Sequence, residues 1–468
     1  MTHEFLLDSQ VLKQSTNITR EPVVAEKMAS NPVLSPQPPW EGGLDRIGLP
    51  SLFVDEDEKL RMLYWTRKPS NLLGNICTAE SLDGETWERT LLYKYPSGSG
   101  DPTQIIVDDG DLPGSYTQTT TLWVLENPRP DLLPNSKYLG LIEMRDPRNT
   151  FIVTSPNGID WDLENRHMVT DEKNDTESSL VYGPDGKFHA YIRGWITHGD
   201  GTRERVVDMA ESTDLQNWSE RTRIMQGSVD HQVYGMQTKE LDGVYVSLMS
   251  VFHTENQTLD NELVYSRDAN TFEREFPLTP SLPHGEEGDW DYGMAYHNSG
   301  IIEWNGRWLV AYTGGENEHD SNPVTPLDIG MASFDRGRLI CNAQSDPNSS
   351  AFIETLPLST EGAGLLVNAE LAEGILRVEL VDENGNPVDG YGMDDCILSA
   401  YDDLRYRVTW NSNWELPESG QYGLRFELDQ GASMYAYEFI VAPEPSSLVL
   451  GVIFLACAGW RKQPHRRK

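Results

Sequence analysis

The sequence Ser81-Leu82-Asp83-Gly84-Glu85-Thr86-Trp87 is a tight turn that ends in a tryptophan, and the chain repeats it. Each copy follows a short apolar run, which predicts a strand, an Asp/Asn-Gly type turn and an aromatic residue that begins the next strand. The other copies start at Ser155, Ser212, Ser266 and, with more divergence, Ser333. A strand hairpin that recurs every few tens of residues indicates a stacked or radial array.

A second register supports the repeat, because an aspartate precedes the first strand of each unit. The five are Asp45, Asp101, Asp175, Asp230 and Asp291. In three units this aspartate lies 36 or 37 residues before the serine of the turn, which leaves room for three strands, and a fourth follows the aromatic residue. Four-stranded antiparallel units around an axis form a β-propeller whose innermost strands line a central channel. The sequence therefore predicts an all-β fold that begins with a five-bladed β-propeller.

The pattern changes after the fifth unit. Short strands separated by polar turns, such as Ile375–Val381 and Tyr422–Leu428, predict a β-sandwich that follows the propeller. We expect an N-terminal segment with more loop than strand at 1–40, the propeller at 41–348, the sandwich at 349–442 and a separate tail at 443–468.

Composition limits the class of function. The chain has 468 residues and a formal net charge of −37, which argues against a nucleic-acid partner because phosphate repels negative charge. Its four cysteines are far apart and form no C-x-x-C pair. The sequence indicates no cofactor and no metal, and it leaves a structural calcium open without indicating one.

The tail combines Pro443-Glu444-Pro445, the apolar run 446–460 and a basic end. This order resembles the PEP-CTERM sorting signal of bacterial exported proteins, which implies export, recognition by an exosortase and transient membrane association through 446–460. That run is shorter than the ~20 apolar residues of a comfortable bilayer span. Residues 1–8 lack the basic start and apolar core of a signal peptide, so we expect the true start to lie upstream.

Five blades and a sandwich resemble glycoside hydrolase families 32, 43 and 68. Several phrases are similar to uncharacterised bacterial family 32-like proteins, including Asn31–Leu34, Asp230-His231-Gln232 and Trp290–Met294. The resemblance implies a carbohydrate-active protein that acts on an oligosaccharide or polysaccharide.

Glycosidases need two carboxyl groups, one as proton donor and one as nucleophile or base. Carried over from the resemblance, Asp45 is the base or nucleophile, Asp175 or Asp101 is the modulator and Glu177 is the acid. The expected substrate-binding residues at the channel mouth are Arg46, Arg193, Trp195, Asp230, His231, Asp291, Tyr292 and His297. His319 is expected at the same mouth.

Structural roles compete with each of these hypotheses. An aspartate at the start of a strand often caps backbone N–H groups, and histidines without metal-ligand spacing are more often hydrogen-bonded structural residues. The turn tryptophans are expected to pack between blades and not to bind sugar. The chain also lacks the Trp-x-Asn-Asp-Pro and Glu-Cys motifs of family 32. A glycan- or surface-ligand-binding propeller without catalysis and a surface assembly scaffold therefore stay open as alternatives.

Overall fold

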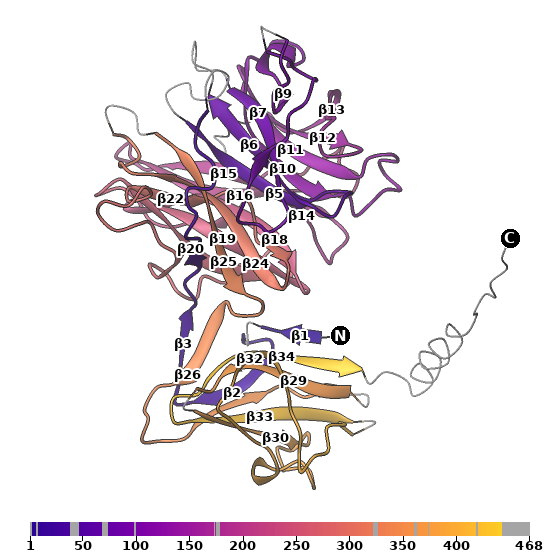
Figure 1. The fold of residues 1–468 in the computed structure, drawn as a ribbon, viewed down its shortest axis with the longest axis vertical. Helices are drawn as coiled ribbons and strands as arrows, with labels where there is room; N and C mark the ends of the chain where they lie inside the picture. Colours follow the sequence, from indigo (N-terminus) through magenta and orange to yellow (C-terminus); the bar gives the residue numbers. More distant parts are fainter. Residues whose placement is uncertain are drawn as a thin grey trace, which may run out of the picture. The chain divides into compact units, whose positions relative to one another are not determined.

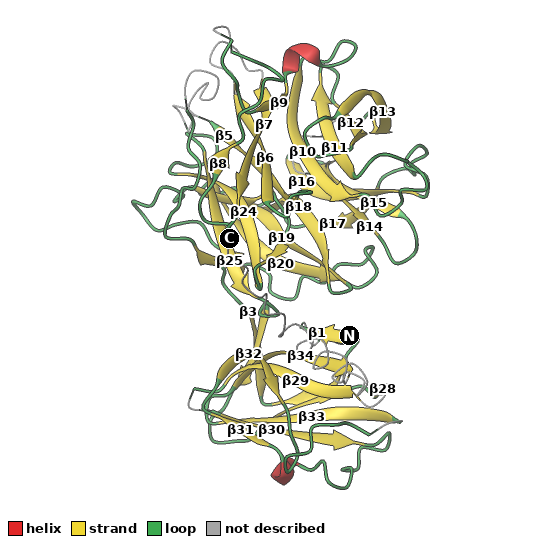
Figure 2. Cartoon of the chain, turned by 45° about the vertical axis from the view of Figure 1, so that its right-hand side comes forward, coloured by secondary structure: helices red, strands yellow, loops and turns green. Residues whose placement is uncertain are grey.

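The structure is a computed structural model of the whole chain. It describes residues 2–5, 8–37, 46–67, 74–97, 100–172, 174, 178–321, 326–359, 363–372, 374–417 and 420–441. Nearly all regular structure in these ranges is strand, apart from two short 3-10 helices (Figure 2). The chain divides into two compact units, Pro22–Leu339 and a second unit built from 1–21 and 340–468.

The larger unit is a five-bladed β-propeller (Figure 1). Each blade has four antiparallel strands in sequence order, except that the last blade takes its outer strand from the N-terminal segment. The first two blades are β5 (Ile47–Val54), β6 (Leu60–Arg67), β7 (Gly74–Ser81), β8 (Glu88–Arg89); and β10 (Gln118–Glu126), β11 (Tyr138–Arg145), β12 (Asn149–Ser155), β13 (Asp162–Thr170). The third and fourth are β14 (Ser179–Tyr182), β15 (Phe188–Thr197), β16 (Arg203–Ser212), β17 (Thr222–Met225); and β18 (His231–Leu241), β19 (Val244–His253), β20 (Thr258–Ser266), β21 (Pro280–Leu282). The fifth is β22 (Met294–His297), β24 (Arg307–Gly315), β25 (Asp328–Asp335) and β4 (Glu26–Lys27). Three shorter elements complete the unit: β9 (Ile105–Val107), η1 (Asp109–Asp111) and β23 (Ile302–Trp304).

Apolar clusters between neighbouring blades close the ring. Separate clusters join blades one and two, two and three, three and four, and four and five. A further cluster joins the last blade to the first, since Leu309 and Met331 pack with Leu52 and Leu60. The faces between blades are therefore the core of this unit.

The repeated turn fastens itself through side-chain hydrogen bonds. In the first copy the Ser81 hydroxyl accepts from the Gly84 N–H at 2.8 Å, and Asp83 accepts from the N–H groups of Glu85 and Thr86. The hydrogen bond from the Thr86 N–H is the main reason why the pKa of Asp83 falls to about 2. The Trp87 indole donates to the Gly84 carbonyl at 3.1 Å. This geometry explains why the motif recurs independently of function.

The turn tryptophans pack between blades, as predicted. Trp87 and Trp161 are buried in the clusters on either side of the first blade, and Trp218 lies against the cluster of blades two and three. They are part of the core and are not sugar platforms.

The smaller unit is a β-sandwich of two sheets (Figure 1). One sheet contains β3 (Ile18–Pro22), β26 (Ile340–Gln344), β34 (Ser433–Val441), β29 (Ala363–Glu370) and β32 (Asp402–Arg407), with β1 (Thr2–Glu4) on β34. The other contains β2 (Leu12–Thr16), β27 (Ala351–Thr355), β33 (Gln421–Asp429), β30 (Ile375–Val381) and β31 (Ile397–Ser399), with β28 (Leu358–Ser359) on β33. The 3-10 helix η2 (Met393–Asp395) lies between β30 and β31.

The N-terminal segment is more ordered than the sequence suggested. Within 1–40 the structure describes three strands of the sandwich and β4 of the propeller, so this segment contributes to both units, although most of its described residues lie outside strands. The strand pattern of this segment is weak in the sequence because four of the five residues of β2 are exposed and polar. The buried residues flank the strand, as Val11 does.

No helix in the described ranges is long and apolar enough to cross a membrane. The tail at 443–468, with its predicted sorting signal, lies outside the described residues.

Candidate functional site

One end of the propeller channel is built from the starts of the innermost strands and the ends of the second strands, which coincide because the strands are antiparallel. The register shows this clearly. Each turn serine pairs across the sheet with a residue near the start of the second strand of its blade. Seven residues after that partner, the second strands of blades one to four carry Arg67, Arg145, Trp195 and Phe252. The same structural position thus presents arginine or a large aromatic residue in four successive blades.

Tyr234, near the start of β18, is the centre of a cluster at this end. Its hydroxyl hydrogen-bonds Nε2 of His319 at 2.7 Å, and its ring lies 5.9 Å from that of Tyr296 and 6.1 Å from that of Phe252, between centroids. A β-bulge between Val233 and Gly235 sets the direction of its side chain. The cluster thus combines aromatic rings with a polar hydroxyl.

Two arginines of the third blade pack on the same tyrosine. The Arg193 guanidinium carbon lies 4.0 Å from the Tyr234 ring centroid, and that of Arg205 lies 5.2 Å from it. Arg193 is buried and its Nε donates to the Tyr234 carbonyl at 2.7 Å, whereas Arg205 is half-buried and donates to Gln232 Oε1 at 2.9 Å. Arg193 therefore fixes the position of Tyr234 through both its backbone carbonyl and its ring.

The first blade adds two further cations. Arg46 and Arg67 are both half-buried, and the Arg67 N–H donates to the Arg46 carbonyl. Burial lowers the pKa of Arg46, Tyr296 opposes the shift and the charge of Arg67 adds to it. Burial likewise lowers the pKa of Arg67. Arg46 also interacts electrostatically with Tyr234, which places it in the cluster.

Histidines line the edge of the cluster. Nδ1 of His231 lies 2.9 Å from Nδ1 of His253, whose Nε2 faces Asp260 Oδ2 at 3.1 Å. The hydrogen bond to Asp260 raises the pKa of His253. Burial lowers the pKa of His319, and the charges of Arg205 and Arg193 contribute, although Asp320 opposes them.

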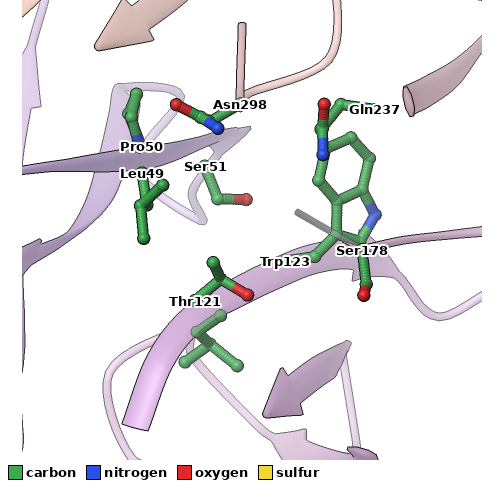
Figure 3. A pocket seen from close by; sticks show the side chains of 9 residues that line it. Leu49, Pro50, Ser51, Thr121, Trp123, Ser178, Gln237 and Asn298 are labelled. Atoms are coloured by element: carbon green, nitrogen blue, oxygen red, sulfur yellow. The ribbon is translucent and has the colours of Figure 1, made fainter. Parts of the chain in front are cut away.

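Deeper along the channel axis, side chains from all five blades meet around a cavity of about 10 Å³, room for one water molecule (Figure 3). Ser51, Trp123, Ser178, Gln237 and Asn298 line it, one from each blade. The Gln237 amide is buried with no hydrogen-bond partner on either end. The channel is therefore filled by side chains here and leaves room for no ligand larger than a water molecule.

Three of the four predicted catalytic residues, Asp45, Asp175 and Glu177, lie outside the described residues. The fourth, Asp101, is exposed in the loop between β8 and β9. The register that placed Asp101 at the start of an innermost strand is wrong, because that strand is β10 and begins 17 residues later at Gln118. The long proline- and threonine-rich insertion of this unit misled the spacing.

Two predicted binding residues are part of the core. Asp291 is buried and accepts from Lys27 Nζ at 2.7 Å and from the Tyr312 hydroxyl at 2.9 Å, so it attaches the N-terminal strand β4 to the last blade. His297 is fully buried, hydrogen-bonds the Leu248 carbonyl through Nδ1, and has its pKa lowered to about 4 by burial. The placement of both at the channel mouth is wrong.

The other predicted binding residues divide into two groups. Arg46, Arg193, Trp195 and His231 lie at the channel end with Tyr234. Asp230 is exposed beside His231, and the Tyr292 ring contacts His284 and not the cluster.

One group of potential metal ligands occurs in the described part of the chain, at the opposite end of blade three: Asp185, His189 and Glu211. Nε2 of His189 faces Asp185 at 3.0 Å, and Nδ1 faces Glu211 at 3.7 Å. The two ring nitrogens face different carboxylates, and Lys187 Nζ lies 3.0 Å from Glu211, so in this structure these side chains pair with one another.

The predicted site residues did not include Tyr234, Arg67 or Arg205. The available signal was the recurrence of arginine near the end of the second strand, at Arg67, Arg145 and Arg193 in the first three units.

The chain matches no protein-family model and no curated protein. Solved structures similar in fold include a glycosyl hydrolase from Bacteroides ovatus, with 15% identity over 68% of this chain and 96% of that one, at a TM-score of 0.47. They also include the β-1,2-mannobiose phosphorylase from Listeria innocua in complex with β-1,2-mannobiose, with 12% identity over 66% of this chain and 96% of that one, at a TM-score of 0.47.

Proposed function

We propose that this protein is an exported carbohydrate-active protein that hydrolyses a glycosidic bond with paired carboxylates at the Tyr234 end of the propeller channel. The observation that carries the proposal is the cluster itself. Tyr234 and Trp195 are half-buried and supply ring surface, while Arg205 and His319 supply hydrogen-bonding groups beside it. Apolar sugar faces stack on such rings, and sugar hydroxyls require hydrogen-bond partners at their edges.

The sequence supplies carboxylates next to this end. Asp45 immediately precedes Arg46, and Asp175 and Glu177 lie between Asn174 and Ser178, of which Ser178 lines the axial cavity. The Asn174 side-chain amide donates to the Ser178 hydroxyl at 2.7 Å. In the proposed mechanism Glu177 protonates the leaving oxygen, Asp45 acts as nucleophile or base, and Asp175 sets their charge balance. Arg46 and Arg193 orient these carboxylates.

The test is sugar release from a panel of plant and algal polysaccharides by the purified protein. We expect Asp45→Asn and Glu177→Gln each to reduce release by at least about 10³-fold, because each removes one of two required carboxyl groups. Asp101→Asn is the matched control, since Asp101 is exposed in a loop, and should leave release unchanged. Glycan binding without turnover, unaffected by these substitutions, would instead identify a binding propeller.

Export rests on the tail. We propose that an exosortase recognises Pro443-Glu444-Pro445, that residues 446–460 associate transiently with the membrane, and that the tail is then removed. Expression with and without an exosortase tests this by mass spectrometry of the envelope fraction. An intact tail in the presence of the exosortase contradicts the proposal.

A further inference from the structure

Three side chains of the fourth blade form a continuous hydrogen-bonded row at the Tyr234 end of the channel: Asp260, His253 and His231. Nε2 of His253 faces Asp260 Oδ2 at 3.1 Å, and Nδ1 of His253 lies 2.9 Å from Nδ1 of His231. The two imidazole rings lie 5.1 Å apart between centroids and cross at 73°. The row thus joins the third strand of the blade to its innermost strand, on which Tyr234 follows His231 by three residues.

Strand register brings the row to one face of the blade. His231 pairs directly with His253 across β18 and β19, and Asp260 lies diagonally opposite His253, two residues beyond its partner in β20. Residues an even number of positions away on the same three strands pack in the cluster between blades three and four: Val233, Val251 and Val264. Because the side chains of a strand alternate between its two faces, the row lies on the face toward blade three.

The geometry fixes where the protons are when both histidines are neutral. The Asp260 carboxylate is an acceptor, so Nε2 of His253 carries the proton of that ring and its Nδ1 is bare. Two bare nitrogens would repel each other at 2.9 Å, so the proton of His231 is on Nδ1 and is donated to His253. His231 is therefore held in the tautomer whose Nε2 is bare.

This bare nitrogen is open to a ligand. Nε2 of His231 hydrogen-bonds no group in the described part of the chain. His231 is half-buried and its Nε2 is not enclosed, so a molecule at this end of the channel can reach it. Such a nitrogen accepts a hydrogen bond and donates none.

Charges around the row favour the uptake of a proton. The hydrogen bond to Asp260 is the largest cause of the raised pKa of His253, and burial opposes it. The charge of Glu262 raises this pKa further, whereas Arg274, which pairs with Glu262, lowers it.

One added proton changes the outer nitrogen, whichever ring holds the charge. Three protons then occupy Nε2 of His253, the gap between the two Nδ1 atoms and Nε2 of His231, so the last of these becomes a donor. Further charged groups lie beside this strand end. Asp230 is exposed directly before His231, and on the side of blade three the Arg205 guanidinium donates to Gln232 Oε1 at 2.9 Å.

We propose that Asp260 and His253 are positioning residues that hold His231 Nε2 as the acceptor for a hydroxyl group of the bound sugar, and that one proton taken up by the row ends this contact. The inference rests on the proposed carbohydrate function and adds a residue that selects a hydroxyl donor at this end of the channel. In the neutral row the sugar hydroxyl donates to Nε2, whereas in the protonated row Nε2–H has no lone pair to accept it.

Nuclear magnetic resonance of the full chain with isotope-labelled histidine tests the row without any glycan. Long-range proton–nitrogen correlation separates protonated from bare ring nitrogens, and His231→Gln assigns the signals of His231. We expect the Nδ1–H tautomer of His231 when the row is neutral, and a protonated Nε2 once the pH falls through the titration of the row. Asp260→Asn should move this titration to lower pH because it removes the charge that stabilises the added proton, and Asp260→Glu should restore part of the shift.

Turnover or binding of the same polysaccharide panel tests the contact with sugar. His231→Ala should lower kcat/KM at least tenfold, mainly through KM, because a hydrogen bond to the sugar is lost. The matched control is His167→Ala, since His167 is also half-buried but lies on the outermost strand of blade two. In wild type KM should rise as the pH falls through the titration of the row, and His231→Gln should lose this rise because its amide does not titrate.

A neutral His231 with its proton on Nε2 overturns the inference and leaves the proposed function intact. This measurement is made on wild type, so it decides even where Asp260→Asn does not fold. A KM that follows pH equally in wild type and in His231→Gln also overturns the inference, because the titrating group then lies elsewhere. Absence of binding and turnover across the whole panel overturns the proposed function and, with it, the contact of His231 with sugar.

Discussion

Replacing Asp291 with alanine should destabilise the propeller and leave the chemistry of the site intact. The carboxylate is 3% exposed and joins Lys27 on the N-terminal strand to Tyr312 on the last blade. In the variant the Tyr312 hydroxyl stays buried without this acceptor, although it still accepts from Asn31 at 3.2 Å. Lys27 keeps partial access to water, with 26% of its side chain exposed.

The expected loss follows from these contacts. Removing one partner of a buried ion pair costs about 3–5 kcal/mol, and the access of Lys27 to water places this case at the lower end, near ~3 kcal/mol. In a unit of this size each 1 kcal/mol shifts the melting temperature by ~2 °C, so the propeller transition should fall by about 6 °C. Asp291→Asn retains an acceptor for Tyr312 and should lose only ~1–2 kcal/mol.

Differential scanning calorimetry of the full chain, with urea unfolding followed by tryptophan fluorescence, measures the change. Asp230→Ala is the matched control, because Asp230 is exposed directly before β18 of the neighbouring fourth blade. Its replacement should change the free energy of unfolding by less than ~0.5 kcal/mol. If Asp291→Ala melts like wild type but loses glycan binding, the structural role assigned to Asp291 is refuted and the sequence-based assignment to the channel is restored.

Three further predictions concern stability and the site. Burial lowers the pKa of His297 to about 4, so between pH 6.5 and 4 the unfolded chain binds more protons than the folded chain. The free energy of unfolding is therefore unaffected by this residue above pH 6.5 and falls by up to ~3 kcal/mol as the pH falls to 4. His297→Gln should flatten that part of the pH–stability curve, and an unchanged curve contradicts the buried, neutral state of His297. Gly158 has a φ of 77°, and a Cβ there would lie 2.6 Å from the Phe53 ring, so Gly158→Ala should lower the free energy of unfolding in urea by at least ~2 kcal/mol. Gly201→Ala should cost less, because Gly201 has a φ of 87° but open space around it. Equal losses would mean that backbone strain alone matters. Tyr234→Phe removes the hydrogen bond to His319 and should lower glycan turnover about tenfold, or ~1.4 kcal/mol, with little change in melting temperature; unchanged kinetics would remove Tyr234 from the site.

The strands and their turns follow from local sequence alone. The Ser-x-Asp turn forms through hydrogen bonds that span two or three residues, as from Gly84 to Ser81, and the tryptophans of the first three copies pack between blades. Such short-range interactions follow from local residue order, so the number of blades and the sandwich after them could be predicted. The N-terminal strands could not, because a polar edge strand such as β2 gains its partners only from distant chain.

Which charged and aromatic residues meet depends on the tertiary fold. Asp291 looked like the other strand-opening aspartates, yet its role depends on Lys27, which lies 264 residues earlier in the chain. Arg46, Arg205 and Tyr234 likewise come from three blades and are brought together by closure of the ring. A strand's local pattern specifies which of its faces is buried, whereas the neighbours of a side chain at the channel end depend on the order and closure of all five blades.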